Sequence, residues 1–284
     1  MNKRILTIQD YSCLGRCSLT VALPIISGCG IECVGIPTAV LSNHTAFPKW
    51  TYHDLTEEIS KTAGMWQGFN TEFDAIYTGY LGKGQEDVIA SVVRRFKNEK
   101  NLYLMDPAFG ADGHLYPGFD DEHVEKMKSL LPIADLITPN LTEACALLGK
   151  KYPLSYTRRF INNLARNLSK LGPRFVIISG LAFREGRIAC MGYDGKLNKF
   201  YYYETDLLLD GVHGAGDCFA STVISALVSG LSLKSAIKAA HDFVHAALKN
   251  NLEDKINPRL YGPVFEPEIS ALRKQILKES KKAA

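Results

Sequence analysis

Short apolar runs alternate along this chain with longer segments in which apolar residues recur at helical spacing. We predict buried strands at residues 5–9, 33–36, 75–78, 102–105, 136–138 and 175–179. Helices are predicted between them at residues 17–27, 53–68, 85–98, 121–131, 142–148 and 157–171. In the last of these helices the apolar residues follow a period of about 3.6. Strands that alternate with helices predict parallel pairing with right-handed crossovers.

The last third of the chain has a different pattern. Residues 187–193 and 197–204 are typical of a β-hairpin with an Asp-Gly turn at Asp194-Gly195. Beyond residue 216 the pattern is helical almost to the end. No internal repeat, low-complexity segment or linker rich in Pro, Gly or Ser divides the chain. We therefore expect an α/β fold: a single domain over residues 1–284, with a doubly wound, mostly parallel sheet flanked by helices.

Charge and hydropathy exclude several classes of partner. Lysine and arginine (33) only slightly outnumber aspartate and glutamate (30), which gives a net charge of +3. No block of five or six basic residues indicates nucleic-acid binding. No apolar run reaches the roughly 18 residues that a membrane helix needs. The apolar stretch after Met1 is too short for a signal-peptide core. We expect a cytoplasmic protein that binds neither membranes nor nucleic acid.

Cysteine usage agrees with a reducing compartment. The seven cysteines are an odd number and are scattered, which favours free thiols over a disulfide framework. The spacings Cys13-x3-Cys17 and Cys29-x3-Cys33 are also compatible with a metal site. Cys29 lies between two glycines in Ser-Gly-Cys-Gly, and Cys33 lies in an apolar run where small buried cysteines are common. Packing is therefore the favoured interpretation.

The predicted sheet indicates where chemistry should occur. In open α/β sheets, ligands bind beyond the carboxyl ends of the strands. Polar side chains follow most of the predicted strands, more of them than the fold needs for its stability. These residues are Asp10, Tyr80, Asp106, Asn140, Glu143 and Ser179.

The most specific local motif is the run from His213 to Asp217, His-Gly-Ala-Gly-Asp, ahead of an apolar helix. Its glycines allow a ligand to approach the backbone, and the following helix N-terminus suits phosphate. Asp217 is either a ligand-facing carboxylate or only a helix cap. The motif is neither a Walker loop, which ends in Gly-Lys-Ser/Thr, nor a dinucleotide fingerprint, because Phe219 stands where its last glycine belongs.

The sequence around two other carboxylates also allows two interpretations, a structural one and a functional one. Asn140 and Glu143 have the spacing of a capping box. Glu143 at a strand end could instead hold a hydrated Mg²⁺. Asp106, before Pro107, is either a turn former or a partner of such a metal.

Several segments occur together in a familiar order over about residues 4–250. Gly-Ala-Gly-Asp and Asn-x-x-Glu are typical of the ribokinase-like superfamily, and Ser-Asn-His-Thr with Thr-Gly-Tyr narrows the resemblance to its vitamin B6 branch. The chain resembles the pyridoxal kinases. The segments are Ile8-Gln9, Ser42 to Thr45, Thr78 to Gly82, Asp106-Pro107, Thr138 to Glu143 and Gly214 to Asp217.

This resemblance implies a ribokinase-like fold and transfer of phosphate from ATP, with Mg²⁺, to the 5′-hydroxymethyl group of pyridoxal, pyridoxine or pyridoxamine. It also implies a homodimer, and it leaves a monovalent-cation requirement open. Asp217 matches the general base, and Gly214, Ala215 and Gly216 match the anion hole. Vitamin-site positions are Asp10, His44, Thr45, Tyr80 and Asp217. ATP-site positions are Asp106, Thr138, Asn140, Glu143 and Ser179, with Asp106 and Glu143 reaching the metal through water.

Two positions depart from the pattern of the relatives. Asp10 stands where they typically have serine, and a carboxylate only accepts hydrogen bonds and adds charge. Arg16 lies in a segment that is usually glycine-rich, where it could reach a phosphate, although a surface carboxylate is the favoured partner. A kinase for hydroxymethylpyrimidine and a non-catalytic protein that binds B6 or nucleotide remain the alternatives.

Overall fold

The computed structural model describes residues 3–283 and confirms the α/β architecture. The strands of its main sheet lie in the order β11-β10-β9-β8-β5-β4-β1-β2-β3. The six from β9 to β2 in this order are parallel, and β3, β10 and β11 pair antiparallel at the two edges. The strands are β1 (Arg4–Ser12), β2 (Glu32–Leu41), β3 (Tyr52–Asp54), β4 (Ala75–Thr78), β5 (Leu102–Met105), β8 (Leu136–Ile137), β9 (Phe175–Leu181), β10 (Arg187–Asp194) and β11 (Lys199–Asp206).

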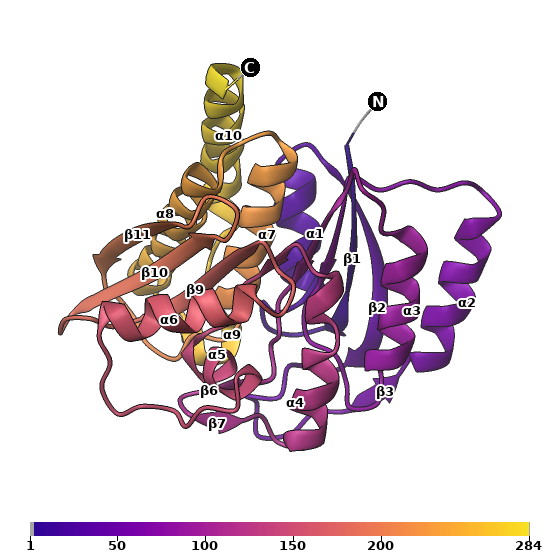
Figure 1. Cartoon of the computed structure of the whole chain (residues 1–284), viewed down its shortest axis with the longest axis horizontal. Helices are drawn as coiled ribbons and strands as arrows, with labels where there is room; N and C mark the ends of the chain where they lie inside the picture. The colour runs from indigo at the N-terminus through magenta and orange to yellow at the C-terminus, as the bar shows by residue number, and fades with distance from the viewer. Residues whose placement is uncertain (1–2, 284) are drawn as a thin grey trace.

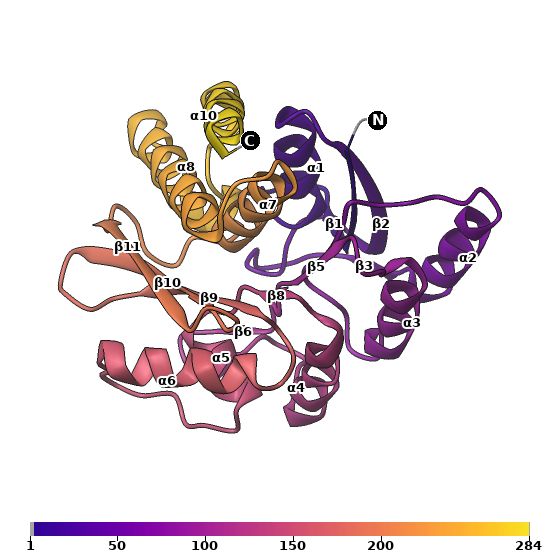
Figure 2. The ribbon, with the colours of Figure 1, turned by 45° about the horizontal axis from the view of Figure 1, so that its top comes forward.

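Helices cover both faces of this sheet, as Figure 2 shows. Two apolar cores, one on each face, hold the layers together. One face carries α2 (Thr56–Gln67), α3 (Glu86–Phe96), α4 (Asp121–Lys128), α5 (Leu141–Leu147) and α6 (Arg158–Ser169). The other carries α1 (Leu19–Gly28), α7 (Ala215–Val228), α8 (Leu233–Asp254) and α10 (Ile269–Ala283). Short α9 (Pro258–Tyr261) joins α8 to the C-terminal segment (Figure 1).

Helix α7 is apolar on all sides because it is buried on all sides. It packs against α1 and α8 as well as against the sheet. Almost all its residues after Gly216 are buried. This central position holds the start of the helix rigidly beside the strand ends.

Three local expectations were wrong. Residues 53 and 54, expected to begin a helix, lie in β3 (Tyr52–Asp54), which pairs with the end of β2. The Asp54 carboxylate then accepts the Thr56 amide at 2.9 Å as α2 begins. The helix predicted over residues 121–131 ends at Lys128, and Pro132 lies in a separate 3₁₀ turn (Leu131–Ile133). The predicted hairpin is present, but Asp194 still pairs with Lys199, so residues 195–198 form a four-residue loop.

Three further findings concern the helices, the cysteines and the potential metal ligands. Among the described residues, no helix combines the length and apolarity that crossing a bilayer requires. All seven cysteines are free thiols. Within residues 3–283, moreover, no three His, Cys, Asp or Glu side chains come close enough together to hold a metal ion by themselves.

Candidate active site at the carboxyl ends of the strands

A cavity of about 490 Å³ runs along the carboxyl ends of the parallel strands and the start of α7. Its wall contains every site residue expected from the sequence. In the part of the chain that the structure describes, no lysine or arginine lines it, although it contains several carboxylates. The expected residues in the wall are Asp10, His44, Thr45, Tyr80, Asp106, Thr138, Asn140, Glu143, Ser179, Gly214, Ala215, Gly216 and Asp217.

Asp217 lies in the first turn of α7, and its side chain is buried. The N-cap of this helix is Gly214, and no described side chain caps it, so the interpretation of Asp217 as only a helix cap is wrong. The Ser18 amide donates to Asp217 Oδ2 at 2.9 Å, and Cys17 Sγ lies 3.4 Å from the same oxygen. Burial, with help from the Asp10 charge, raises the pKa of Asp217 to about 6. A carboxylate of this basicity is suited to accept a proton near neutral pH.

The two glycines before Asp217 differ in the space that is available for a side chain. Gly214 has a φ of +79°, and a Cβ atom there would lie 1.9 Å from the Arg16 carbonyl oxygen. A Cβ at Gly216 would meet no heavy atom within 4 Å. The first-turn amides of α7 have no partners within the helix and carry the positive end of its dipole. Amides of this kind can bind an anion, so the predicted anion hole beside Asp217 is compatible with the structure.

Glu143 is the capping residue that its spacing from Asn140 predicts, and its role toward a metal stays a prediction. Its Oε2 accepts the Asn140 amide at 2.9 Å, while Asn140 Oδ1 accepts the Glu143 amide at 3.1 Å, so the capping box at the start of α5 is confirmed. Glu143 Oε1 also accepts the amides of Phe109 (3.0 Å) and Gly110 (3.4 Å). Even so, burial raises its pKa to about 7. The carboxylate lines the cavity while it fixes two backbone segments.

Asp106, after β5, is a second buried carboxyl group in the cavity wall. Burial, followed by the charges of Glu143 and Asp217, raises its pKa well above the usual range. The buried hydroxyl of neighbouring Thr138 acts in the opposite direction and lowers this pKa. This end of the cavity is therefore buried and acidic.

Asp10 and Tyr80 line the other end of the cavity. Asp10 is 4% exposed, and the Ser12 hydroxyl donates to its Oδ2 at 2.8 Å. Burial raises its pKa. Tyr80 packs against Phe119, whose ring centroid lies 5.5 Å away. This end thus combines an aromatic wall with a buried acceptor.

Both ring nitrogens of His44 form hydrogen bonds with the backbone. Nε2 lies 2.8 Å from the Leu260 carbonyl oxygen, and Nδ1 accepts the Ala46 amide at 3.3 Å. Because a carbonyl only accepts, Nε2 carries the proton and Nδ1 does not. Burial lowers the pKa of His44 and keeps the ring neutral. The side chain offers a bound molecule its ring surface and not a hydrogen bond.

Some residues of the site were missed from the sequence. Ser18 and Cys17 both contact Asp217, but Ser18 carries no motif of its own and Cys17 was considered only as a metal ligand. His241 and His245 line the far end of the cavity, one turn apart on α8. Arg16 was expected to meet a surface carboxylate, and this is confirmed because its Nε lies 2.6 Å from Glu266 Oε1.

Comparisons with known proteins identify the family to which this geometry belongs. A family model described as phosphomethylpyrimidine kinase matches residues 31–264. The chain belongs to this kinase family. The pyridoxal kinase of Granulibacter bethesdensis is 27% identical over 266 residues, which cover 88% of this chain and 90% of that protein. The pyridoxine kinase of Bacillus subtilis is 32% identical over 216 residues, 74% of each chain.

The solved structures agree with this assignment. A Bacteroides thetaiotaomicron protein, described as a phosphomethylpyrimidine kinase and crystallised with pyridoxal, is 34% identical and covers 96% of both chains with a TM-score of 0.92. The pyridoxal kinase of Lactobacillus plantarum is 25% identical with a TM-score of 0.87. The ribokinase-like fold and the membership of the pyridoxal kinase family are thereby confirmed. The roles of individual residues in this kinase remain predictions.

Proposed function

We propose that this kinase transfers the γ-phosphoryl group of ATP to the 5′-hydroxymethyl group of a B6 vitamer. The observation that carries the proposal is the position of Asp217. Its buried, weakly acidic carboxylate lies at the start of α7, in the same cavity as the vitamin-side residues Asp10 and Tyr80 and the phosphate-side residue Asp106. In this arrangement a bound vitamer would present its alcohol to the base beside the phosphates of ATP.

In the proposed reaction the chain supplies a base and fixed positive dipoles. Asp217 takes the proton of the vitamin's alcohol as its oxygen attacks the γ-phosphorus, and the bond to the bridging oxygen of ADP breaks. Asp217 Oδ2 accepts the Ser18 amide, so Oδ1 is the oxygen available to the proton. The first-turn amides of α7, at Gly216 and Asp217, meet the negative charge on the transferring group.

The carboxylates of the cavity fit a magnesium ion that arrives with ATP. Mg²⁺ prefers carboxylate oxygen, phosphate and water. Asp106 and Glu143 line the cavity, burial raises the pKa of both, and no described lysine or arginine lies in the wall to balance their charge when they are ionised. These two residues would hold the ion through water, and the ion would neutralise the phosphates. A monovalent cation would relieve the same excess of negative charge.

A panel of substrates tests the proposed function. Purified protein is incubated with Mg²⁺, ATP and, separately, pyridoxal, pyridoxine, pyridoxamine and hydroxymethylpyrimidine, and each product is identified by mass. We expect a phosphate monoester and ADP with at least one B6 vitamer. Activity confined to hydroxymethylpyrimidine would favour the function in the family's name, and pyridoxal binding without ADP release would favour a non-catalytic protein.

The pKa of Asp217 predicts the acid limb of the pH profile. Catalysis needs the carboxylate form, which is lost as the pH falls through about 6. We therefore expect kcat/KM for the vitamin to fall about tenfold per pH unit below that value. Initial rates in overlapping buffers with saturating ATP measure this. A rate unchanged well below pH 6 would contradict the assigned role.

Asp10 is expected to influence the choice of vitamer. The vitamers differ in the group next to the reacting alcohol, and the buried carboxylate accepts hydrogen bonds where relatives carry a hydroxyl. Asp10→Ser should change the ratios of kcat/KM among pyridoxal, pyridoxine and pyridoxamine by at least about threefold. Steady-state kinetics on all three substrates measure the ratios. Unchanged ratios would place Asp10 outside the contacts that recognise the substrate.

We also propose a cytoplasmic homodimer. The seven free thiols support a reducing compartment. Tyr11 and Val40, in register on neighbouring strands, are 39% and 37% exposed, and Trp50, just before β3, is 41% exposed. Exposed apolar groups at the carboxyl ends of β1 and β2 are suited to pairing with a second copy. Light scattering of the purified protein tests this, and the mass of one chain would contradict it.

A further inference from the structure

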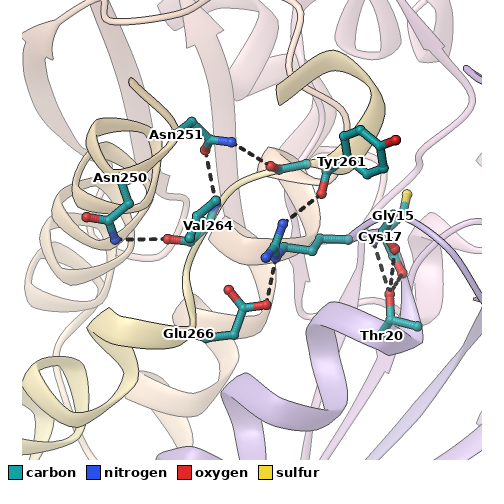
Figure 3. Close-up of polar contacts among 10 residues, drawn as sticks. Gly15, Cys17, Thr20, Asn250, Asn251, Tyr261, Val264 and Glu266 are labelled. Carbon is teal, nitrogen blue, oxygen red and sulfur yellow. Dashed lines mark hydrogen bonds and ion pairs between the residues drawn. The ribbon is translucent and has the colours of Figure 1, made fainter. Parts of the chain in front are cut away.

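Residues 260–266, here called the C-terminal strap, run from α9 back toward α10 and are tied to the end of α8 (Figure 3). Asn251 Nδ2 donates to the Gly262 carbonyl oxygen at 3.0 Å, and the Val264 amide donates to Asn251 Oδ1 at 3.0 Å. Asn250 Nδ2 donates to the Val264 carbonyl oxygen at 3.0 Å. Asn251 is 2% exposed, so both of its hydrogen bonds are made away from water. Such bonds are costly to break on one side only.

The strap holds Arg16 by its backbone and its side chain. The Arg16 amide and Nη1 both donate to the Tyr261 carbonyl oxygen, at 3.2 and 3.1 Å, and the guanidinium pairs with Glu266. A Cβ at Gly262 would lie 2.6 Å from the Arg16 carbonyl oxygen, and one at Gly214 would lie 1.9 Å from it. The Arg16 backbone is therefore packed between the strap and the glycine that begins α7.

The residues after Arg16 need such support. Ser18 has a φ of +53°, a conformation that costs a non-glycine residue about 1 kcal/mol or more and persists only where the surroundings impose it. In this conformation the Ser18 amide reaches Asp217. At its other end the strap presents the Leu260 carbonyl oxygen to His44. The strap thus contacts Arg16, close to the residues that hold Asp217, and also His44 on the vitamin side of the cavity.

We propose that the C-terminal strap positions the catalytic base, and that Asn251 and Glu266 are positioning residues that act through Arg16 and Ser18. This rests on the proposed function only in so far as Asp217 is the base. When the strap is loosened, residues 15–18 relax, the Ser18 amide leaves Asp217, and the carboxylate is no longer held in one orientation. ATP binding is unaffected, because no residue of the strap lines the cavity.

Two variants test this proposal, and each is examined by steady-state kinetics and by alkylation of Cys17. Asn251→Ser removes the bridge to the strap, and Glu266→Gln removes the charge that anchors Arg16 while keeping the shape of the side chain. In both we expect kcat to fall, by about 10- to 100-fold in Asn251→Ser and less in Glu266→Gln, with the KM for ATP within about twofold of wild type. We also expect faster alkylation of Cys17, followed by peptide mass, because the loop opens more often. Lys249→Ala, which removes only an exposed ion pair with Glu253 on the same helix, is the control and should change neither readout.

The outcomes separate this inference from the proposed function. If both variants keep the wild-type kcat, or if kcat falls without faster alkylation of Cys17, the positioning role is wrong. If Asn251→Ser does not fold, Glu266→Gln decides. A wild-type protein inactive on every vitamer would refute the proposed function, whereas the alkylation rates would still show whether the strap holds the loop.

Discussion

Replacing Asp217 by asparagine should lower kcat at least about a hundredfold, since a general base typically contributes ~10²–10⁴-fold. The side-chain oxygen of asparagine still accepts the Ser18 amide, so the geometry of the site is kept while the proton acceptor is lost. ATP should bind as well or better, because a negative charge beside the phosphate site is gone. Steady-state kinetics and calorimetric titration of ATP measure the two effects.

The same substitution should leave the fold at least as stable. Burial raises the pKa of Asp217 from 3.8 to about 6, so the folded state holds its proton more tightly than the unfolded chain does. The ionised carboxylate therefore costs stability, and this cost grows as the pH rises from about 4 to about 6 and is constant above that. Asparagine removes the cost, and the Tm at pH 8 should equal or exceed that of wild type. A fully active Asp217→Asn enzyme would refute the mechanism.

Much of the fold could be predicted because strand and helix periods differ so clearly here. The strands at residues 75–78 and 102–105 were predicted with their observed bounds, as both are short, apolar and buried on both faces. The errors arose where tertiary contacts decide the structure. Residues 52–54 have no apolar run of their own and become a strand only by pairing with the end of β2.

The placement of the candidate site could also be predicted, because the carboxyl ends of parallel strands share one edge of the sheet. What the sequence could not show is how the side chains are held. The positive φ of Ser18 and the hydrogen bond of His44 Nε2 go with contacts to residues more than 190 positions away. The strap is likewise defined by hydrogen bonds of Asn251, which has no motif around it.

The second large effect is expected at Gly214 of the proposed anion hole, and Gly216 provides the matched control. At Gly214 an alanine would have to keep a φ of +79°, and its Cβ would lie 1.9 Å from the Arg16 carbonyl oxygen, which is backbone and cannot rotate away. We expect Gly214→Ala to shift the start of α7 against residues 15–18 and to lower kcat by about a hundredfold or more, since misplacement of about 1 Å has that effect.

Gly216→Ala differs from Gly214→Ala both in the backbone conformation and in the space around the added methyl group. Gly216 has no unusual φ, and its Cβ would meet no protein atom within 4 Å, so the fold should be as stable as wild type or slightly more so. Gly216 lines the cavity, so the methyl group of alanine would occupy space there. We therefore expect any loss of activity to appear as a raised KM for ATP and not as a lower kcat. Kinetics and thermal melts of the two variants measure the contrast. If Gly214→Ala keeps the wild-type kcat, the contact between Arg16 and the start of α7 has no part in positioning the base; if Gly216→Ala leaves the KM for ATP unchanged, the phosphates do not approach the backbone at that residue.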